Sequence, residues 1–238
     1  MSVLRIFTRG VIGALLMASP LSHADLIVSR SIVEMTNGET RTDIVLINSD
    51  ESETLYVQVE PFYVSRPGES AQELIALGAE DNKGLLVSPN RLAIAPSGRS
   101  LVRILNLNED SAMERIYRVN FTPVTPPVEL QAADDNAVRS ALDVVVAYQV
   151  LIIMRPEMPE PVHAITRRGT IAEFHNAGNT NYLLTDGSQC NPGDIEQCQT
   201  LPDRRMYPGN HWTLELPFDG PFNYSIRTPD GISAHQFE

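Results

Sequence analysis

The sequence predicts an all-β protein built from two immunoglobulin-like β-sandwich domains. Short apolar runs alternate with turn residues along the chain, and no long stretch shows a helical period. Three prolines crowd the segment MRPEMPEP, Met154 to Pro161, where they remove amide donors and stiffen the backbone. We therefore expect one sandwich over residues 25–156 and a second over residues 157–238, with a short stiff linker where they join.

The expected strands are rich in Val, Ile, Leu or Tyr and are bounded by Gly, Pro, Asn or Asp. In the first domain they are Thr42–Asn48, Thr54–Tyr63, Arg91–Ile94, Ser100–Leu105, Ile116–Phe121 and Leu142–Met154. One helical turn is expected around Ala71–Leu77. In the second domain the strands are Ala164–Ile171, Asn181–Leu184, Trp212–Leu216 and Tyr224–Arg227. Strands this short and this closely spaced favour a sandwich or a barrel.

Residues 1–24 have the pattern of a secretory signal peptide. Arg5 and Arg9 precede an apolar run, and the segment closes with Ser22-His23-Ala24, whose small residues suit a signal peptidase. The apolar run is shorter than the about 20 residues that a bilayer-spanning helix needs. We expect cleavage after Ala24, export, and no insertion into the membrane.

The charge of the chain argues against nucleic acid as a partner. The sequence has 30 acidic and 18 basic residues, and two of the basic ones lie in the predicted signal peptide. Nucleic-acid binding requires a basic face. We therefore expect no nucleic-acid partner, although the net charge leaves room for local basic pockets.

The two cysteines predict a disulfide bond. Cys190 and Cys198 lie in the stretch TDGSQCNPGDIEQCQTLPD, which has the composition of a loop. A close, even pair in an exported chain favours a disulfide over a metal site, which would need more Cys or His nearby. Such a bond would constrain the loop and contribute roughly 2–3 kcal/mol to stability.

Catalytic motifs are missing from the sequence. The five histidines, His23, His163, His175, His211 and His235, form no H-x-x-x-H pair and accompany no G-x-S-x-G turn, phosphate loop or dinucleotide fingerprint. The acidic pair Asp134-Asp135 lies in the polar segment QAADDN, where a solvated turn is expected. We predict a protein that is not an enzyme and has no cofactor and no metal site.

Several segments together resemble a known family. In the first domain they are SPNRLAIAPSGRSLVRIL (Ser88–Leu105), ERIYRVNFTPV (Glu114–Val124) and VVVAYQVLIIMRP (Val144–Pro156). The second domain adds HNAGNTNYLL (His175–Leu184), the cysteine pair and MYPGNHW (Met206–Trp212). In this order and spacing they are similar to the periplasmic pilus chaperones of the PapD-like family. The resemblance is greatest to the divergent branch that serves colonisation-factor and common-pilus type fimbriae.

The resemblance implies a function and an arrangement of the domains. A chaperone of this family binds fimbrial subunits in the periplasm, completes their unfinished sandwich with a strand of its own, and delivers them to an outer-membrane usher. Its two domains form an L. This mode of recognition is strand addition, in which backbone bonds supply affinity and alternate side chains fill pockets.

The strand to be donated is the one that closes the first domain. From Leu142 onward, every second residue is apolar or aromatic: Leu142, Val144, Val146, Tyr148 and Val150. The intervening residues, Asp143 to Leu151, point to the opposite face by strand geometry. We expect one set to enter a subunit and the other to pack on the chaperone's own core. The alternative is an ordinary buried strand with both faces covered.

The family's basic anchor for the subunit's C-terminal carboxylate is altered here. Alignment on Arg155-Pro156 puts Leu151 where the family has a lysine. Arg118 is our first candidate for the anchor, because Tyr117, Val119 and Phe121 share the other face of its strand. Arg103 is the second candidate and Arg30 the third. A solvated or structural role for Arg118 is the alternative.

The resemblance also gives Arg155 a structural role in an interdomain salt-bridge network. Glu114 is the expected partner, and an exposed pair of this kind contributes about 0–1 kcal/mol. Self-association of the free chaperone through its donor strand stays open.

A pilus subunit or adhesin of the same system is the alternative function. A subunit, however, should lack the closing strand that Leu142–Met154 provides. A generic binding sandwich would expose aromatic residues, but the chain has one Trp and 6% aromatics.

Overall fold

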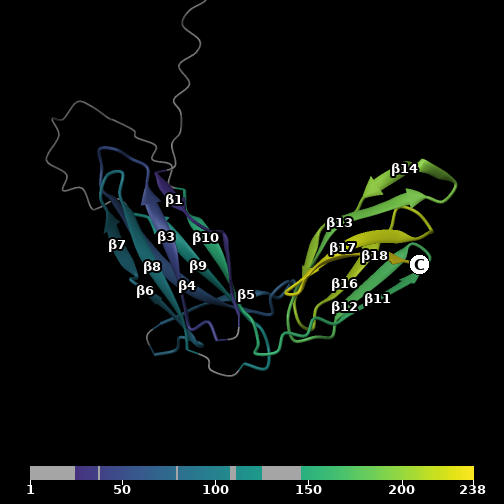
Figure 1. Ribbon diagram of the computed structural model, residues 1–238, viewed down its shortest axis with the longest axis horizontal. Helices are drawn as coiled ribbons and strands as arrows, with labels where there is room; N and C mark the ends of the chain where they lie inside the picture. The colour runs from purple at the N-terminus through teal and green to yellow at the C-terminus, as the bar shows by residue number, and fades with distance from the viewer. Residues whose placement is uncertain (1–24, 37, 79, 108–110, 125–145) are drawn as a thin grey trace, which may run out of the picture.

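The computed structural model describes residues 25–36, 38–78, 80–107, 111–124 and 146–238. These residues form β-strands and connecting turns, with no α-helix among them, so the predicted all-β class is confirmed. Figure 1 shows two lobes that meet at one end and diverge from there. The L-shaped arrangement and the domain boundary after Pro156 stay predictions.

The first lobe consists of two sheets. One has the strand order β1-β3-β8-β6 and is built from β1 (Leu26–Val28), β3 (Arg41–Asn48), β8 (Arg99–Asn106) and β6 (Leu85–Ser88). The other has the order β2-β10-β9-β4-β5, with β7 pairing with β4 outside this order. Its strands are β2 (Ile32–Met35), β10 (Tyr148–Met154), β9 (Arg115–Pro123), β4 (Leu55–Ser65), β5 (Glu73–Ala76) and β7 (Arg91–Ile94).

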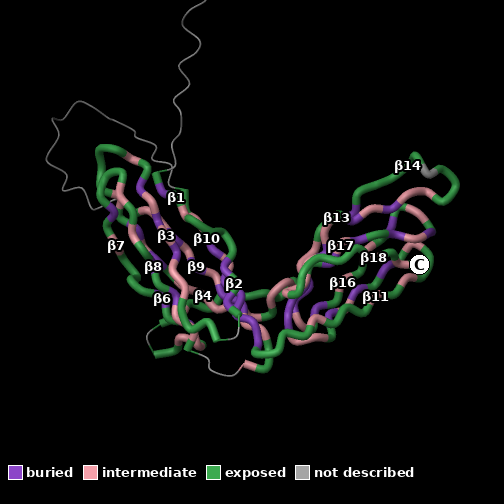
Figure 2. Tube along the Cα trace, in the orientation of Figure 1, coloured by how far each residue is buried: buried purple, intermediate pink, exposed green. Residues whose placement is uncertain are grey.

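A single apolar core joins the two sheets of this lobe. The alternation along β9 shows why: Tyr117, Val119 and Phe121 are fully buried, as the sequence predicts, and the residues between them face outward. Ile44 and Leu46 of β3 and their neighbours in the facing sheet belong to the same cluster. Figure 2 shows buried segments alternating with exposed and intermediate ones along the strands of this lobe. Burial of two facing apolar surfaces is what holds the sandwich together.

The second lobe is a smaller sandwich of the same kind. One sheet has the order β11-β12-β16, from β11 (His163–Arg168), β12 (Ile171–Asn176) and β16 (His211–Glu215). The other has the order β14-β13-β17-β18 and also carries β15. Its strands are β13 (Tyr182–Asn191), β14 (Asp194–Thr200), β15 (Arg204–Met206), β17 (Phe222–Thr228) and β18 (Gly231–Phe237). Phe174 stacks on Trp212 at a ring-centroid distance of 4.7 Å and meets Phe222 and Tyr224 in the core.

Two local predictions were wrong. The helical turn expected around Ala71–Leu77 is the edge strand β5, whose Tyr63–Ile75 and Phe62–Ala76 pairings with β4 supply the backbone bonds that a helix would have supplied internally. The stretch around the cysteines is not a loop but the hairpin of β13 and β14. Polar composition misled the prediction there, because the described residues of β14 are exposed and only β13 contributes to the core.

The predicted disulfide is confirmed. Cys190 of β13 and Cys198 of β14 lie directly opposite each other and are bonded. The bond therefore ties two strands of a hairpin that extends from the end of the second lobe (Figure 1).

Replacing both cysteines by serine should destabilise the second lobe. The expected loss in the free energy of unfolding is roughly 2–3 kcal/mol, the loop-closure value for a sequence separation of 8. Urea denaturation followed by the fluorescence of Trp212, the sole tryptophan, reports on this lobe. An unchanged midpoint and slope would contradict a stabilising role for the bond.

Candidate functional site

Strand β10 has a partner on both sides over only part of its length. On one side it pairs with β9 from Tyr148 to Met154. On the other side it pairs with β2, in parallel, only from Leu151 to Met154. Within the described residues, Tyr148 to Val150 thus form an open sheet edge. Such an edge is a template for another strand.

An apolar row runs along one face of β10 and changes from buried to exposed. Ile152 and Val150 belong to the core of the first lobe, and Val150 is 1% exposed. Tyr148 is half-buried against the same core. Val146, just before the strand, is 44% exposed. The row therefore leaves the protein's own core in the direction of the open edge.

The burial of this row contradicts the predicted donor role of one residue, Val150. Val150 was expected to enter a partner, but its register with the inward-facing Val119 seals it in the protein's own core. Leu142 and Val144 lie outside the described residues. The other face of the strand carries Gln149 and Leu151, which are exposed and half-buried.

Arg118 lies on that outer face, beside the edge. It is paired in register with Leu151 of β10 and with Phe62 of β4. Its guanidinium donates a hydrogen bond to the side-chain oxygen of Gln149, whose amide donates in turn to Asn120 at 2.7 Å. Arg118 Nε is buried and has no hydrogen-bond partner among the described residues. An incoming acceptor would therefore meet the terminal amino groups of the guanidinium, one of which bonds Gln149, rather than the buried Nε.

The face that carries Arg118 points toward the second lobe. At one end of this face, Val64, Ile116 and Ile153 pack against Tyr207. Burial raises the pKa of the Tyr207 hydroxyl, and the positive charges of Arg205 and Arg118 oppose this rise. Arg118 is therefore close enough to the junction to act on a side chain of the second lobe.

The other two predicted anchor residues lie elsewhere. Arg103 is on β8, in the opposite sheet, and its Nε donates to Asp43 Oδ1 at 3.2 Å. Arg30 donates to the backbone oxygen of Asp43 at 3.3 Å. Arg103 and Arg30 thus gather around Asp43, and neither joins Arg118.

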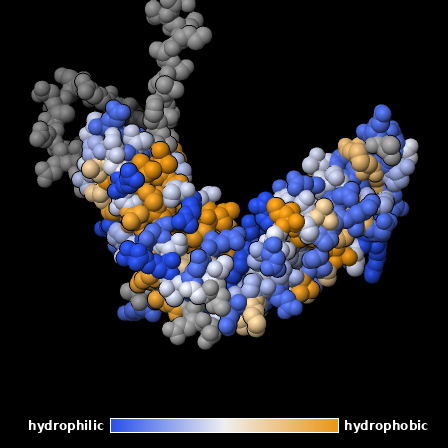
Figure 3. Space-filling model, in the orientation of Figure 1, coloured by the Kyte–Doolittle hydropathy of each residue, from blue (hydrophilic) through white to orange (hydrophobic). Residues whose placement is uncertain are grey.

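Figure 3 shows hydrophobic residues on the surface of the first lobe, and Ile27 and Leu101 of the sheet that contains β8 are among the exposed ones.

Arg155 lies at the centre of a buried network between the lobes. Its guanidinium bonds Glu34 Oε2 at 2.8 Å, Glu114 Oε2 at 3.1 Å and Thr180 Oγ1 at 2.6 Å. Glu114 Oε2 also accepts from the Asn181 backbone amide at 2.9 Å and from its side chain at 2.6 Å. The network therefore links β2, the residue before β9 and the residue after β10 in the first lobe to the two residues that precede β13.

The contribution of about 0–1 kcal/mol expected for an exposed Arg155–Glu114 pair does not apply, because the pair is buried. The side chains of Arg155 and Glu114 are 4% and 0% exposed, so the pair is not an exposed one. Desolvation raises the pKa of Glu114, against the opposing effects of Thr180, Asn181 and Arg155. Sequence reasoning missed Glu34, Thr180 and Asn181, because none of them is a neighbour of Arg155 in the sequence: Glu34 is 121 residues away and Thr180 is 25 residues away.

A second contact between the lobes comes from the turn between β4 and β5. The backbone oxygens of Pro67 and Gly68 accept hydrogen bonds from Asn210 at 3.0 Å and from Arg204 at 3.1 Å. Gly68 has φ +78°, and a Cβ there would lie 2.4 Å from Asn210 Oδ1. Only glycine fits this close approach without strain.

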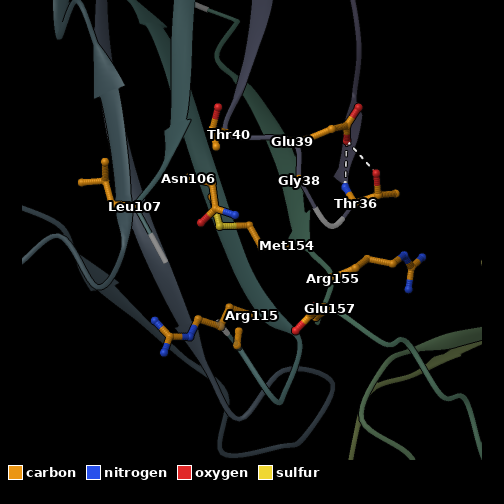
Figure 4. Close-up of a pocket in the computed structure, with 11 residues that line it drawn as sticks. Thr36, Gly38, Glu39, Thr40, Asn106, Leu107, Arg115, Met154, Arg155 and Glu157 are labelled. Atoms are coloured by element: carbon orange, nitrogen blue, oxygen red, sulfur yellow. Dashed lines mark hydrogen bonds between the residues drawn. The ribbon is translucent and has the colours of Figure 1, made fainter. Parts of the chain in front are cut away.

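A pocket lies on another side of the junction (Figure 4). It is lined by residues of the turn after β2 and of the linker, among them Glu39 and Glu157. Glu39 Oε2 accepts hydrogen bonds from the amide of Thr36 at 2.8 Å and from its hydroxyl at 3.2 Å, so this carboxylate is used by the turn itself. Arg155 extends out of this pocket toward its own network.

Two absences hold for the described part of the chain. No group of three or more His, Cys, Asp or Glu side chains lies together as a metal cluster. No helix there has the length and apolar character needed to cross a membrane.

The fold is that of the fimbrial chaperones. The class 5 fimbriae chaperone CfaA superimposes with a TM-score of 0.66 at 17% identity, covering 90% of this chain and 99% of that one. A chaperone–tip adhesin complex of CFA/I fimbriae biogenesis gives 0.64 at 16%, with 90% and 98% covered. The Salmonella enterica SafB chaperone in complex with the SafA pilin gives 0.56 at 16%, with 89% and 95% covered. No protein-family model and no curated protein matches the sequence.

Removal of the Arg155 charge should destabilise the protein strongly. Arg155→Met leaves Glu114 buried without its cation, and breaking a buried pair in this way costs about 3–5 kcal/mol. The matched control is Arg66→Met, which breaks the exposed pair with Glu73 and should cost at most about 1 kcal/mol. Urea denaturation of both variants measures the difference. Equal losses would contradict the network's role, and Arg155→Met/Glu114→Gln should recover part of the stability.

Proposed function

We propose that this protein is a periplasmic chaperone that binds fimbrial subunits by lending them a strand and delivers them to an outer-membrane usher. The observation that carries the proposal is the open edge of β10 at Tyr148–Val150, together with the apolar row that leaves the core there. The likeness of the fold to chaperones solved with an adhesin or a pilin supports it. The alternative of a subunit or adhesin lacks such support.

The edge suits a partner that lacks one strand of its own sandwich. A strand laid beside Tyr148–Val150 would receive backbone hydrogen bonds that β2 does not supply there. Its sheet would then continue the sheet of β10 and β9, with its core on the same side as the apolar row. Leu142, Val144, Val146 and Tyr148 are the proposed donor side chains. Val150 instead fixes the strand in the chaperone.

Arg118 is the proposed anchor for the C-terminal carboxylate of the subunit. It lies one strand away from the open edge, on the face toward the second lobe, and its side chain is half-buried there. A charge-assisted hydrogen bond to a carboxylate is stronger than a neutral one, and more so where water is partly excluded. A bond at a fixed point would set the register of the added strand.

The proposed function also includes export by a signal peptide, two domains and no catalytic activity. Residues 1–24 serve as a signal peptide removed after Ala24, the first domain spans residues 25–156 and the second residues 157–238. The Arg155 network and the Gly68 contact would hold the two domains at a fixed angle, so that Arg118 and the edge present one surface. Neither a cofactor nor a chemical reaction is part of this function.

A charge in the donor row should abolish subunit capture. Val146→Asp would place a carboxylate in the apolar groove of the subunit, where an unpaired charge is strongly unfavourable. We expect the yield of complex to fall by about tenfold or more when the protein is co-expressed with a fimbrial subunit that the wild type captures. Val146 is already exposed, so the variant itself should fold.

The control for this variant is Ile232→Asp. Ile232 is 59% exposed and lies on β18 of the second lobe, away from the donor row. Its replacement should leave the yield of complex unchanged. An undiminished yield with Val146→Asp would argue against the donor assignment.

Loss of the anchor should weaken capture without removing it. Arg118→Ala removes the charge that binds the carboxylate, and a lost charge-assisted bond of about 2 kcal/mol lowers affinity by roughly 30-fold. Arg103→Ala, on the other sheet, is the matched control and should bind normally. Titration with a purified subunit lacking its C-terminal carboxylate separates the roles, because Arg118→Ala should then match the wild type. If Arg103→Ala were the weaker variant, the anchor would lie on the other sheet.

A further inference from the structure

Two histidines that are far apart in the sequence lie face to face on the second lobe. His175 of β12 is the cross-strand partner of His211 of β16. Their rings are stacked with centroids 4.0 Å apart and planes inclined by 7°. Both side chains point away from the core, into which the neighbouring Phe174 and Trp212 are packed.

The register of the two strands explains this closeness. The amide of Asn176 donates to the backbone oxygen of Asn210 at 3.1 Å and its oxygen accepts from the amide of Gly209 at 2.9 Å, so Asn176 occupies a hydrogen-bonded position opposite a bulge. The next pair along an antiparallel ladder is a non-hydrogen-bonded one, and its side chains are the closer of the two kinds. His175 and His211 occupy that pair.

We propose that His175 and His211 bind one divalent transition-metal ion, with Cu²⁺ bound most tightly. Imidazole nitrogen suits Cu²⁺, Ni²⁺ and Zn²⁺, and the general order of affinity places Cu²⁺ first. Two nitrogens that share a metal at about 2.0–2.1 Å each lie within roughly 4 Å of one another. In the stacked arrangement the ring planes are nearly parallel, so both imidazoles must turn out of the stack, about their side-chain torsions, to direct one nitrogen each at the same ion.

The surroundings leave room for the remaining ligands. The pair borders a surface hollow of ≈ 310 Å³. Its outward-facing lining consists of small or polar side chains: Ala164, Thr166, Glu173 and Thr213. No third protein ligand completes a cluster within the described residues, so water would fill the open positions. The site is therefore an exchangeable one with two protein nitrogens, and it is separate from the proposed chaperone edge.

The chain contains its own reporter for the test. Trp212, the only tryptophan, follows His211 and lines the same hollow. Bound Cu²⁺ quenches a nearby indole, so untagged full-length protein can be titrated with CuCl₂ by fluorescence, with calorimetry for the stoichiometry. The matched control is His235→Asn: His235 also faces a histidine, His163, but at 5.3 Å and at 70°, which suits an edge contact.

We expect saturable quenching by one Cu²⁺ per chain. His175→Asn and His211→Asn should each weaken binding at least as much as the about 10-fold that loss of an outer-shell partner costs. His235→Asn should bind as the wild type does. The proposal is overturned if the wild type shows no saturable binding, or if either His175→Asn or His211→Asn keeps wild-type affinity.

Discussion

The rest of the structure depends on the unequal pairing of β10. β9 holds the strand along its whole length, whereas β2 covers only Leu151 to Met154. The covered part is fixed by burial of Val150 and Ile152 in the core, and the uncovered part offers backbone groups to a neighbour. A strand that is anchored at one end and open at the other can bind a partner without losing its own fold.

The junction of the lobes gives this edge a defined setting. Arg155 sits directly after β10, so the network that it forms with Glu34 and Glu114 also fixes the end of the donor strand. On the other side, the glycine turn between β4 and β5 reaches Arg204 and Asn210. Two separate contacts resist rotation better than one. This rigidity keeps Arg118 beside the surface on which a subunit would lie.

Much of this architecture follows from local pattern. The alternation in Tyr117, Val119 and Phe121 predicted the buried face of β9, and the cysteine spacing predicted the disulfide. The errors arose where the local sequence pattern does not determine which strands or side chains meet. Val150 fits either face of a strand by composition, and only its register with Val119 decides that it belongs to the core. The partners of Arg155 and the stacking of His175 on His211 depend on long-range pairing, which local sequence does not encode.

Hydrogen–deuterium exchange of the free protein and of its complex with a subunit tests the central claim most directly. Amides on an uncovered edge exchange fast, and new backbone hydrogen bonds slow them. We expect peptides covering residues 142–150 to gain protection in the complex, while those covering β18 do not change. Unchanged exchange over residues 142–150 in a stable complex would contradict donation of this strand.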